Sequence, residues 1–240
     1  MAESVPVEEV DLLVAGGDLI TMNPRREIIQ GGGLAVVNDE IVAVGSVEKL
    51  RCRYRPVEVI DASDCVITPG MINAHQHLTG DPLVKSCIPD LLAPGESIFS
   101  WSVPLHGSHT PDDDEISAQL TAIEAVTNGV TTLVEAGTVA YPDRVVRGMT
   151  EVGVRGTVGA WGWDIEEGPF TAPVDEIVDR QRDVVKSYPR GGLVEGWVGD
   201  MARYPHQVQS ESRSQLEVPG RRHFVYRSQA SIQRWYDRAA

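Results

Sequence analysis

Cysteine is scarce in this sequence, and its spacing excludes a disulfide-rich fold. The 240 residues contain three cysteines, Cys52, Cys65 and Cys87, and no two of them stand at Cys-x-x-Cys spacing. Secreted domains that depend on disulfides carry many cysteines, usually in even numbers. We therefore expect all three thiols to be reduced.

Long apolar runs and an excess of basic residues are also missing. No stretch approaches the about 18 apolar residues of a membrane span, and the first residues, MAESVPVEEVD, are acidic and lack the apolar core of a signal peptide. The sequence has 21 Lys and Arg against 35 Asp and Glu, a net charge of −14. We expect a cytoplasmic chain that binds neither nucleic acid nor an anionic membrane.

Four catalytic signatures are absent as well. The sequence contains no His-Glu-x-x-His, no Pro-Cys-x-x-Cys, no Gly-x-Ser-x-Gly and no phosphate-binding loop. Each of these motifs places chemistry on a particular local structure, such as the exposed serine of a nucleophile elbow. The corresponding chemistries therefore have no support in this chain.

A pair of histidines at the end of an apolar strand is present instead. Residues 66–72 are predicted to form a strand that Pro69 and Gly70 interrupt, and His75 and His77 follow it. Alternate residues of a strand point to the same face, so the two imidazoles lie about 7 Å apart along the backbone and can converge on one ion. Carboxyl ends of strands are where α/β barrels assemble their chemistry.

Strands and helices alternate through the middle of the chain, which favours a parallel α/β sheet. We predict strands at residues 66–72, 130–135, 156–161 and 193–198, and helices at residues 111–128, 143–152 and 174–187. A complete (β/α)8 (TIM) barrel needs about 250 residues, so the pattern predicts a partial barrel of about four βα units.

The helix at residues 111–128 has the clearest local signals. Thr110 can cap it, Pro111 suits its first turn, and the acidic residues that follow favour its positive end. Its apolar residues recur at helical spacing and are expected to pack on the barrel. These residues are Ile116, Leu120, Ile123 and Val126.

The segment PGMINAHQH, residues 69–77, resembles the first barrel strand of the metal-dependent amidohydrolase superfamily, PG-[FLM]-[IV]-[ND]-x-H-x-H. Upstream, DLLVAGGDLITM and GLAVVNDEIVAVG resemble the N-terminal β-sandwich strands of that family. Downstream, residues 97–137 resemble its first helix and second strand. The resemblance covers residues 11–198 and points to the aminohydrolase branch, which holds the atrazine and melamine hydrolases and the adenosine-type and guanine deaminases.

The resemblance implies a layout and a chemistry. Residues 1–65 would form part of the β-sandwich, residues 66–199 the first half of the barrel, and residues 200–240 a separate tail. His75 and His77 would bind a divalent metal, zinc first and iron next. Water activated by this metal would deaminate an amino-substituted heterocycle. Relatives complete the metal site from later strands, so an inactive remnant with weak metal binding is the alternative.

Five residues near the expected catalytic end are candidates for the substrate pocket: Trp101, Glu135, Trp161, Trp163 and Asp164. Glu135 either orients a ligand histidine or is a structural hydrogen-bond acceptor at the end of a strand. Trp161 and Trp163 either stack on a heterocycle or serve as packing bulk. His106 and His109 end a Pro- and Gly-rich loop, residues 79–109, and are expected at the surface or in a cap.

Composition changes after Gly199. Residues 201–240 hold seven arginines, no lysine and three acidic residues, a net charge of about +4. An interrupted reading frame is the preferred explanation, and a basic tail for an acidic partner or a short local domain are the alternatives. No metal role is assigned to His206 or His223 in this tail. The open strand edges of a half barrel and of an incomplete sandwich predict marginal stability and self-association.

Overall fold

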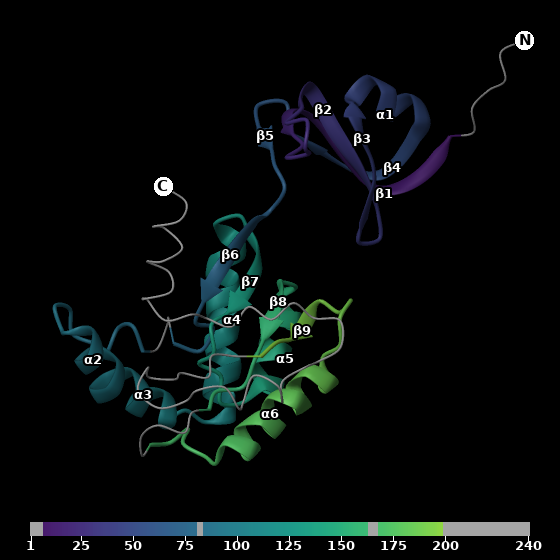
Figure 1. Ribbon diagram of the computed structural model, residues 1–240. Helices are drawn as coiled ribbons and strands as arrows, with labels where there is room; N and C mark the ends of the chain where they lie inside the picture. Colours follow the sequence, from purple (N-terminus) through teal and green to yellow (C-terminus); the bar gives the residue numbers. More distant parts are fainter. Residues whose placement is uncertain (1–6, 81–83, 163–167, 199–240) are drawn as a thin grey trace, which may run out of the picture. The chain divides into compact units, whose positions relative to one another are not determined.

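The computed structural model describes residues 7–80, 84–162 and 168–198. These residues form two compact units, with the boundary in the chain between Gly70 and Met71 (Figure 1). The basic tail, with His206 and His223, lies outside the described residues, and so do Trp163 and Asp164.

The first unit is a five-stranded sheet with one short helix. Its strands lie in the order β3-β2-β1-β4, with β5 also paired to β1; the β1–β2 and β2–β3 pairs are antiparallel and the others parallel. A core of Val10, Leu13, Ala15, Ala35, Leu50 and Tyr54 joins the sheet to α1. The elements are β1 (Glu8–Ile20), β2 (Ile28–Val37), β3 (Glu40–Ser46), α1 (Val47–Arg53), β4 (Tyr54–Asp61) and β5 (Val66–Ile67).

A tight turn at Asn38 and Asp39 joins β2 to β3. Asn38 has a φ of 53°, in the left-handed region that asparagine tolerates better than most residues. Its backbone N–H donates to Asp11 Oδ2 at 2.6 Å, which ties the turn to β1.

The predicted strand at residues 66–72 is wrong as a single element. Val66 and Ile67 pair with β1 in the first unit, whereas β6 (Met71–Gln76) begins the second unit. Pro69 lies between them and has no N–H to donate to a neighbouring strand, so pairing stops there. The segment is largely apolar throughout, so its sequence does not show that its two ends pair in different sheets.

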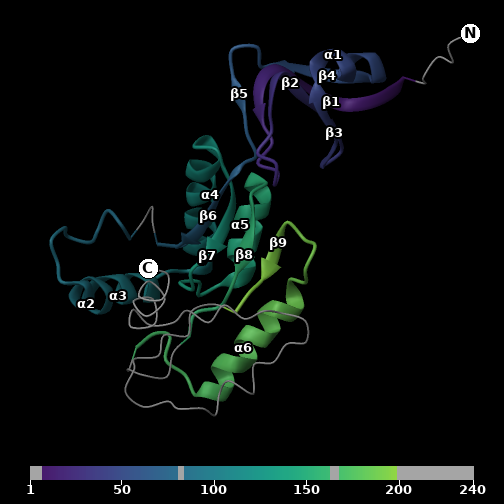
Figure 2. The same ribbon diagram turned by 45° about the horizontal axis from the view of Figure 1, so that its top comes forward.

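The second unit is a parallel sheet in the order β6-β7-β8-β9, with helices between successive strands (Figures 1 and 2). The predicted mixture of parallel strands and helices is confirmed. The elements after β6 are α2 (Pro94–Glu96), the π-helix η1 (Ser97–Ser102), α3 (Val103–Gly107), α4 (Pro111–Thr127), β7 (Val130–Glu135), α5 (Pro142–Val152), β8 (Arg155–Val158), α6 (Val174–Ser187) and β9 (Val194–Gly196). None of the helices in these ranges has both the length and the apolar character that crossing a bilayer requires.

Helix α4 begins as predicted but packs through a different face. Thr110 and Asp113 form a reciprocal capping box, in which Thr110 Oγ1 accepts from Asp113 N at 3.3 Å and Asp113 Oδ2 from Thr110 N at 2.8 Å. The expected packing stripe is wrong, because its four members are 37–50% exposed: Ile116, Leu120, Ile123 and Val126. The small residues Ala118 and Ala122 are fully buried instead.

Close approach between helices explains this choice of face. A Cβ added to Gly148 of α5 would lie 2.7 Å from Glu115 O and 3.3 Å from Ala118 Cβ, so the two helices meet with little room for large side chains. Small residues allow this approach, and branched apolar residues do not. The buried face of α4 also carries hydroxyls: Ser117 Oγ donates to Thr79 O at 2.9 Å and Thr121 Oγ1 to Leu78 O at 3.1 Å.

Candidate metal site

His75 and His77 converge at the carboxyl end of β6. Their Nε2 atoms lie 3.2 Å apart, and their rings meet edge to face with centroids 5.0 Å apart. Two nitrogens bound to one tetrahedral zinc, with Zn–N bonds of about 2.1 Å, are separated by about 3.4 Å. The pair therefore fits two of the four positions around such an ion.

The strand is irregular at this point. Its pairing with β7 shifts register between Asn73 and Gln76. The Asn73 side chain bonds two residues further along the strand: its Oδ1 accepts from His75 N at 3.2 Å and its Nδ2 donates to Gln76 Oε1 at 2.7 Å. The strand pairing is therefore irregular just where the two histidines lie, and their rings converge as alternate residues of a strand can.

Glu135, at the end of β7, joins the segment after His77 to the loop after β7. The carboxylate is 2% exposed. Its Oε2 accepts from Leu78 N at 2.7 Å, and its Oε1 accepts from Gly137 N at 2.7 Å and Thr138 N at 2.8 Å. Burial raises the pKa of Glu135, while the hydrogen bonds from these N–H groups favour its ionised form.

Thr138 connects this carboxylate to a ligand histidine. Its Oγ1 lies 3.3 Å from Glu135 Oε1 and 3.3 Å from His77 Nδ1. Thr79 supports the same loop, because its hydroxyl donates to Thr138 O at 2.7 Å. Thr138 follows the strand predicted at residues 130–135, and the Gly137–Thr138 pair just after Glu135 was the signal available in the sequence.

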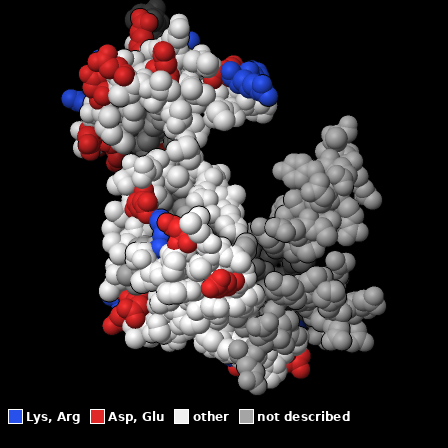
Figure 3. Space-filling view, turned by 90° about the vertical axis from the view of Figure 1, so that its left-hand side faces the viewer, with Lys and Arg blue, Asp and Glu red and all other residues white. Residues whose placement is uncertain are grey.

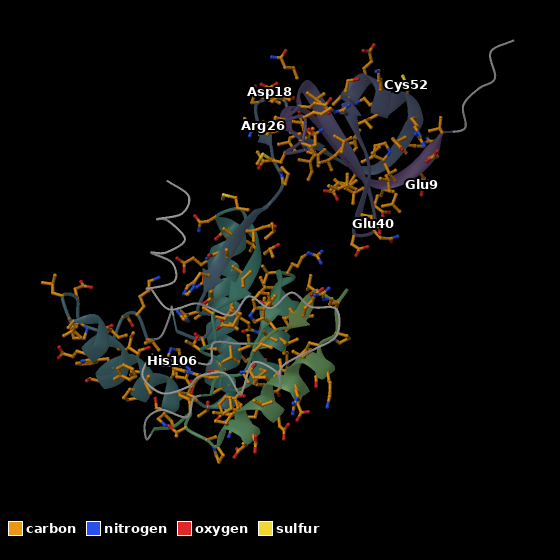
Figure 4. All side chains as sticks on the ribbon, in the orientation of Figure 1. Glu9, Asp18, Arg26, Glu40, Cys52 and His106 are labelled. Carbon is orange, nitrogen blue, oxygen red and sulfur yellow. The ribbon has the colours of Figure 1, made fainter. Side chains whose placement is uncertain are left out.

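His106 is buried, and the expectation of a surface or capping role for it is wrong. It belongs to α3, is 3% exposed, and lies where α3 approaches the sheet (Figure 4). Thr79 Oγ1 is 3.4 Å from its Nδ1, and a Cβ on Gly80 would come within 2.9 Å of its Nε2. Burial, and then the electrostatic influence of the neighbouring His109 and His77, lower the pKa of His106 to about 4.

His109 is also withdrawn from solvent. Its side chain is 8% exposed, and its Nδ1 lies 3.0 Å from Asp114 Oδ1. The other oxygen of Asp114 accepts from Tyr141 N at 3.0 Å and Ala140 N at 3.2 Å. The segment before α4 looks irregular in sequence because its helices are short, yet tertiary contacts hold both histidines in place.

The tryptophan candidates are used differently from one another. Trp161 is 8% exposed; one face stacks on Phe170 at 4.0 Å, and its ring meets that of His106 edge to face at 5.2 Å. Trp101, on η1, is 37% exposed. The structure thus brings His75 and His77 together, links Glu135 to His77 through Thr138, and places Trp161 in a hydrophobic cluster with Val103 and Phe170.

The site as described supplies two ligands. Within residues 7–80, 84–162 and 168–198, no three His, Cys, Asp or Glu side chains gather around one possible ion position. A divalent ion held only by His75 and His77 would keep water in its other positions.

Several known proteins are similar to this chain in sequence over part of their length. No protein-family model matches the chain. The chain is 26% identical over 188 residues to a 5-methylthioadenosine/S-adenosylhomocysteine deaminase of Syntrophobacter fumaroxidans, which covers 77% of this chain and 41% of the relative. A deaminase of the same name from Bacillus cereus is 33% identical over 113 residues, 47% of this chain and 25% of the relative. The chain therefore spans less than half the length of these relatives.

Solved structures extend the likeness to the fold. A zinc-bound adenosine deaminase from Xanthomonas campestris matches with a TM-score of 0.69 and 23% identity, over 79% of this chain and 42% of that one. An Arthrobacter aurescens triazine hydrolase matches with a TM-score of 0.64 and 23% identity, over 77% and 45%. The Escherichia coli guanine deaminase matches with a TM-score of 0.59 and 15% identity, over 76% and 45%. The chain therefore resembles members of the deaminase branch of the metal-dependent amidohydrolase superfamily, as the segment PGMINAHQH predicted.

Proposed function

We propose that this chain takes part in the metal-dependent hydrolysis of a C–N bond, with His75 and His77 as two of the metal ligands. One observation carries the proposal: the 3.2 Å approach of two imidazole Nε2 atoms at the carboxyl end of the first strand of a parallel sheet. In this proposal the second unit is the first half of a (β/α)8 barrel, and the first unit is part of the accompanying β-sandwich.

Zinc is the proposed ion, with iron as the second choice. Neutral imidazole suits both ions, and sites of this donor type favour them over magnesium or calcium. The Xanthomonas campestris neighbour is described with bound zinc, and so is an Arthrobacter aurescens atrazine chlorohydrolase that also matches the fold. Such an ion supplies Lewis acidity that makes water a nucleophile near neutral pH.

The proposed substrate is a small heterocycle that bears an exocyclic amine. The relatives are named for the deamination of 5-methylthioadenosine and S-adenosylhomocysteine, and the structural neighbours include adenosine and guanine deaminases. All of these compounds carry an amino-substituted purine. Trp101, with 37% of its surface exposed, is more accessible to such a ring than the buried Trp161. Trp161 remains a pocket candidate only if Phe170 leaves its face.

Metal binding without catalysis is the second candidate function. The observation in its favour is that the described ranges bring only two potential ligands together. A site with two protein ligands binds zinc more weakly than one with three or four.

Elemental analysis after exhaustive dialysis, combined with an ammonia-release assay, distinguishes a hydrolase from a chain that only binds metal. The unaltered chain is compared with a His75→Ala, His77→Ala double variant, using 5-methylthioadenosine, adenosine and guanine as trial substrates. A Cys52→Ser, Cys65→Ser, Cys87→Ser variant is the control, because these exposed thiols could bind zinc by themselves.

Each result decides between the candidates. Near-stoichiometric zinc that is lost only in the histidine variant, together with ammonia release, supports the hydrolase. Retained zinc without ammonia release supports metal binding alone. Zinc that is absent, or that disappears only in the cysteine variant, contradicts both.

A further inference from the structure

The hydroxyl of Thr138 lies between the buried Glu135 carboxylate and the His77 ring, 3.3 Å from Oε1 of the first and 3.3 Å from Nδ1 of the second. We propose that Thr138 is a positioning residue that fixes the tautomer of His77, with the proton on Nδ1 and the lone pair on Nε2. The use of this lone pair for a cation rests on the proposed function, whereas the tautomer itself is a property of the metal-free protein.

The first step concerns the single proton of the Thr138 hydroxyl. Glu135 Oε1 already accepts from Gly137 N and Thr138 N, so it acts as an acceptor toward this turn. A hydroxyl has one proton to donate and two lone pairs that accept. The Thr138 proton therefore points to Glu135 Oε1, and its lone pairs face the other neighbours.

Thr79 does not change this assignment. Its own hydroxyl proton is donated to the Thr138 carbonyl oxygen at 2.7 Å, a much shorter contact than its 3.5 Å approach to Thr138 Oγ1. The Thr138 hydroxyl consequently keeps a lone pair directed at His77 Nδ1.

The second step concerns the imidazole. A ring nitrogen that faces a lone pair at hydrogen-bond distance must carry a proton, and in a neutral imidazole the other nitrogen then has none. His77 therefore donates from Nδ1 to Thr138 Oγ1 and presents an unprotonated Nε2. Without metal, the 3.2 Å contact between the two Nε2 atoms is satisfied by a proton on His75 Nε2.

The arrangement also limits movement of the ring. Glu135 holds Thr138 through its backbone N–H and hydroxyl, and through Oε2 it holds Leu78 N, the residue that follows His77. One buried carboxylate thus fixes both the backbone beside His77 and the hydroxyl that contacts its ring. Partners of this kind that orient ligand histidines typically change metal affinity by about 10–100-fold when removed.

The test is nitrogen-15 NMR of the full chain, metal-free and labelled in histidine, because ring-nitrogen shifts distinguish the two neutral tautomers. The expected spectrum has His77 with a protonated Nδ1 and an unprotonated Nε2. Thr138→Val should shift His77 to a mixture that contains the other tautomer, and Thr138→Ser should restore the original one. Thr121→Val is the matched control: it removes a buried threonine hydroxyl bonded to Leu78 O and leaves the His77 contact in place.

Cobalt titration followed by visible absorption provides a second readout. We expect Thr138→Val to weaken cobalt binding by at least about 10-fold and Thr138→Ser by much less. A protonated Nε2 on His77 in the unaltered chain overturns the proposal without any variant, and so does an unchanged tautomer in folded Thr138→Val. If Thr138→Val changes the tautomer of His77 but the unaltered chain binds no cobalt, the proposed function is contradicted and the positioning role of Thr138 is supported.

Discussion

Glu135 is the residue on which the geometry around His77 depends most. It is a buried acceptor for three backbone N–H groups, from Leu78, Gly137 and Thr138. Sequence alone offered two interpretations, a group that orients a ligand and a structural acceptor. The structure supports both: Glu135 is a structural acceptor, and it reaches His77 through Thr138.

Removal of this carboxylate should destabilise the folded chain strongly. Glu135→Ala leaves three backbone N–H groups, two of them buried, without their acceptor, so we expect the free energy of unfolding to fall by about 3 kcal/mol or more. Urea denaturation measures the change. Glu195→Ala is the comparison, because Glu195 accepts one backbone N–H, from Gly191, at an exposed position; its loss should cost less than about 1 kcal/mol. Equal losses in the two variants would contradict the anchoring role of Glu135.

His106 gives the stability a pH dependence. Its pKa falls from 6.5 to about 4 in the folded chain because burial disfavours the charged ring. As the pH falls, this histidine therefore takes up a proton in the unfolded chain before it does so in the folded chain. The contribution of neutral His106 to the free energy of unfolding is fully present above about pH 6.5 and is lost as the pH falls toward 4. The full loss approaches about 3 kcal/mol.

Denaturant midpoints between pH 4 and 7 test this dependence. The unaltered chain should lose stability as the pH falls through this range, and His106→Gln, which removes the titrating group, should show a shallower slope. If the two slopes are equal, burial of His106 does not control this part of the pH dependence.

At the scale of elements, α4 depends on a local signal that is visible in sequence. Thr110→Ala removes one half of the capping box, and we expect a loss of about 1 kcal/mol in the free energy of unfolding. Ser46→Ala at the start of α1 is a matched control, because the Ser46 side chain makes no capping hydrogen bond. Comparable losses at both positions would show that the capping bonds of Thr110 contribute little.

Local sequence signals predicted the bounds of several elements closely. They failed where the pairing of a strand depends on residues far away in the chain. The helix at residues 174–187 and the strand at residues 130–135 have the predicted bounds. Capping residues and β-branched runs act within a few residues, so they can be recognised in a sequence. The division of residues 66–72 between two sheets depends on β1 and β7, which are distant in the chain.

At the scale of the whole molecule, apolar surface remains exposed in the second unit. Met71 and Ile72 of β6 are 56% and 68% exposed, and the four apolar residues of the α4 stripe are 37–50% exposed. Exposed apolar groups of this extent are uncommon in soluble monomers and favour association. On the face seen in Figure 3, Asp and Glu are more widespread than Lys and Arg, in keeping with the net charge of −14.

We predict that the chain self-associates through this apolar surface. Light scattering after size exclusion should show a mass above that of one chain, rising with concentration. A Leu120→Lys, Ile123→Lys variant should move the population toward the monomer, whereas Glu124→Lys, which changes charge on the same helix without removing apolar surface, should not. A monomer at every concentration would count against the prediction.

The sequence by itself determined the resemblance to a family, the alternation of strands and helices, and the pair of histidines, because each of these is carried by short stretches of neighbouring residues. The tertiary structure alone decided that α4 packs through Ala118 and Ala122, that His106 is buried, and that Thr138 lies between Glu135 and His77. These features depend on contacts between residues far apart in the chain, such as the 61 positions that separate His77 from Thr138. Close packing selects such partners by shape and by hydrogen-bonding capacity, and neither is visible in the periodicity of a single segment.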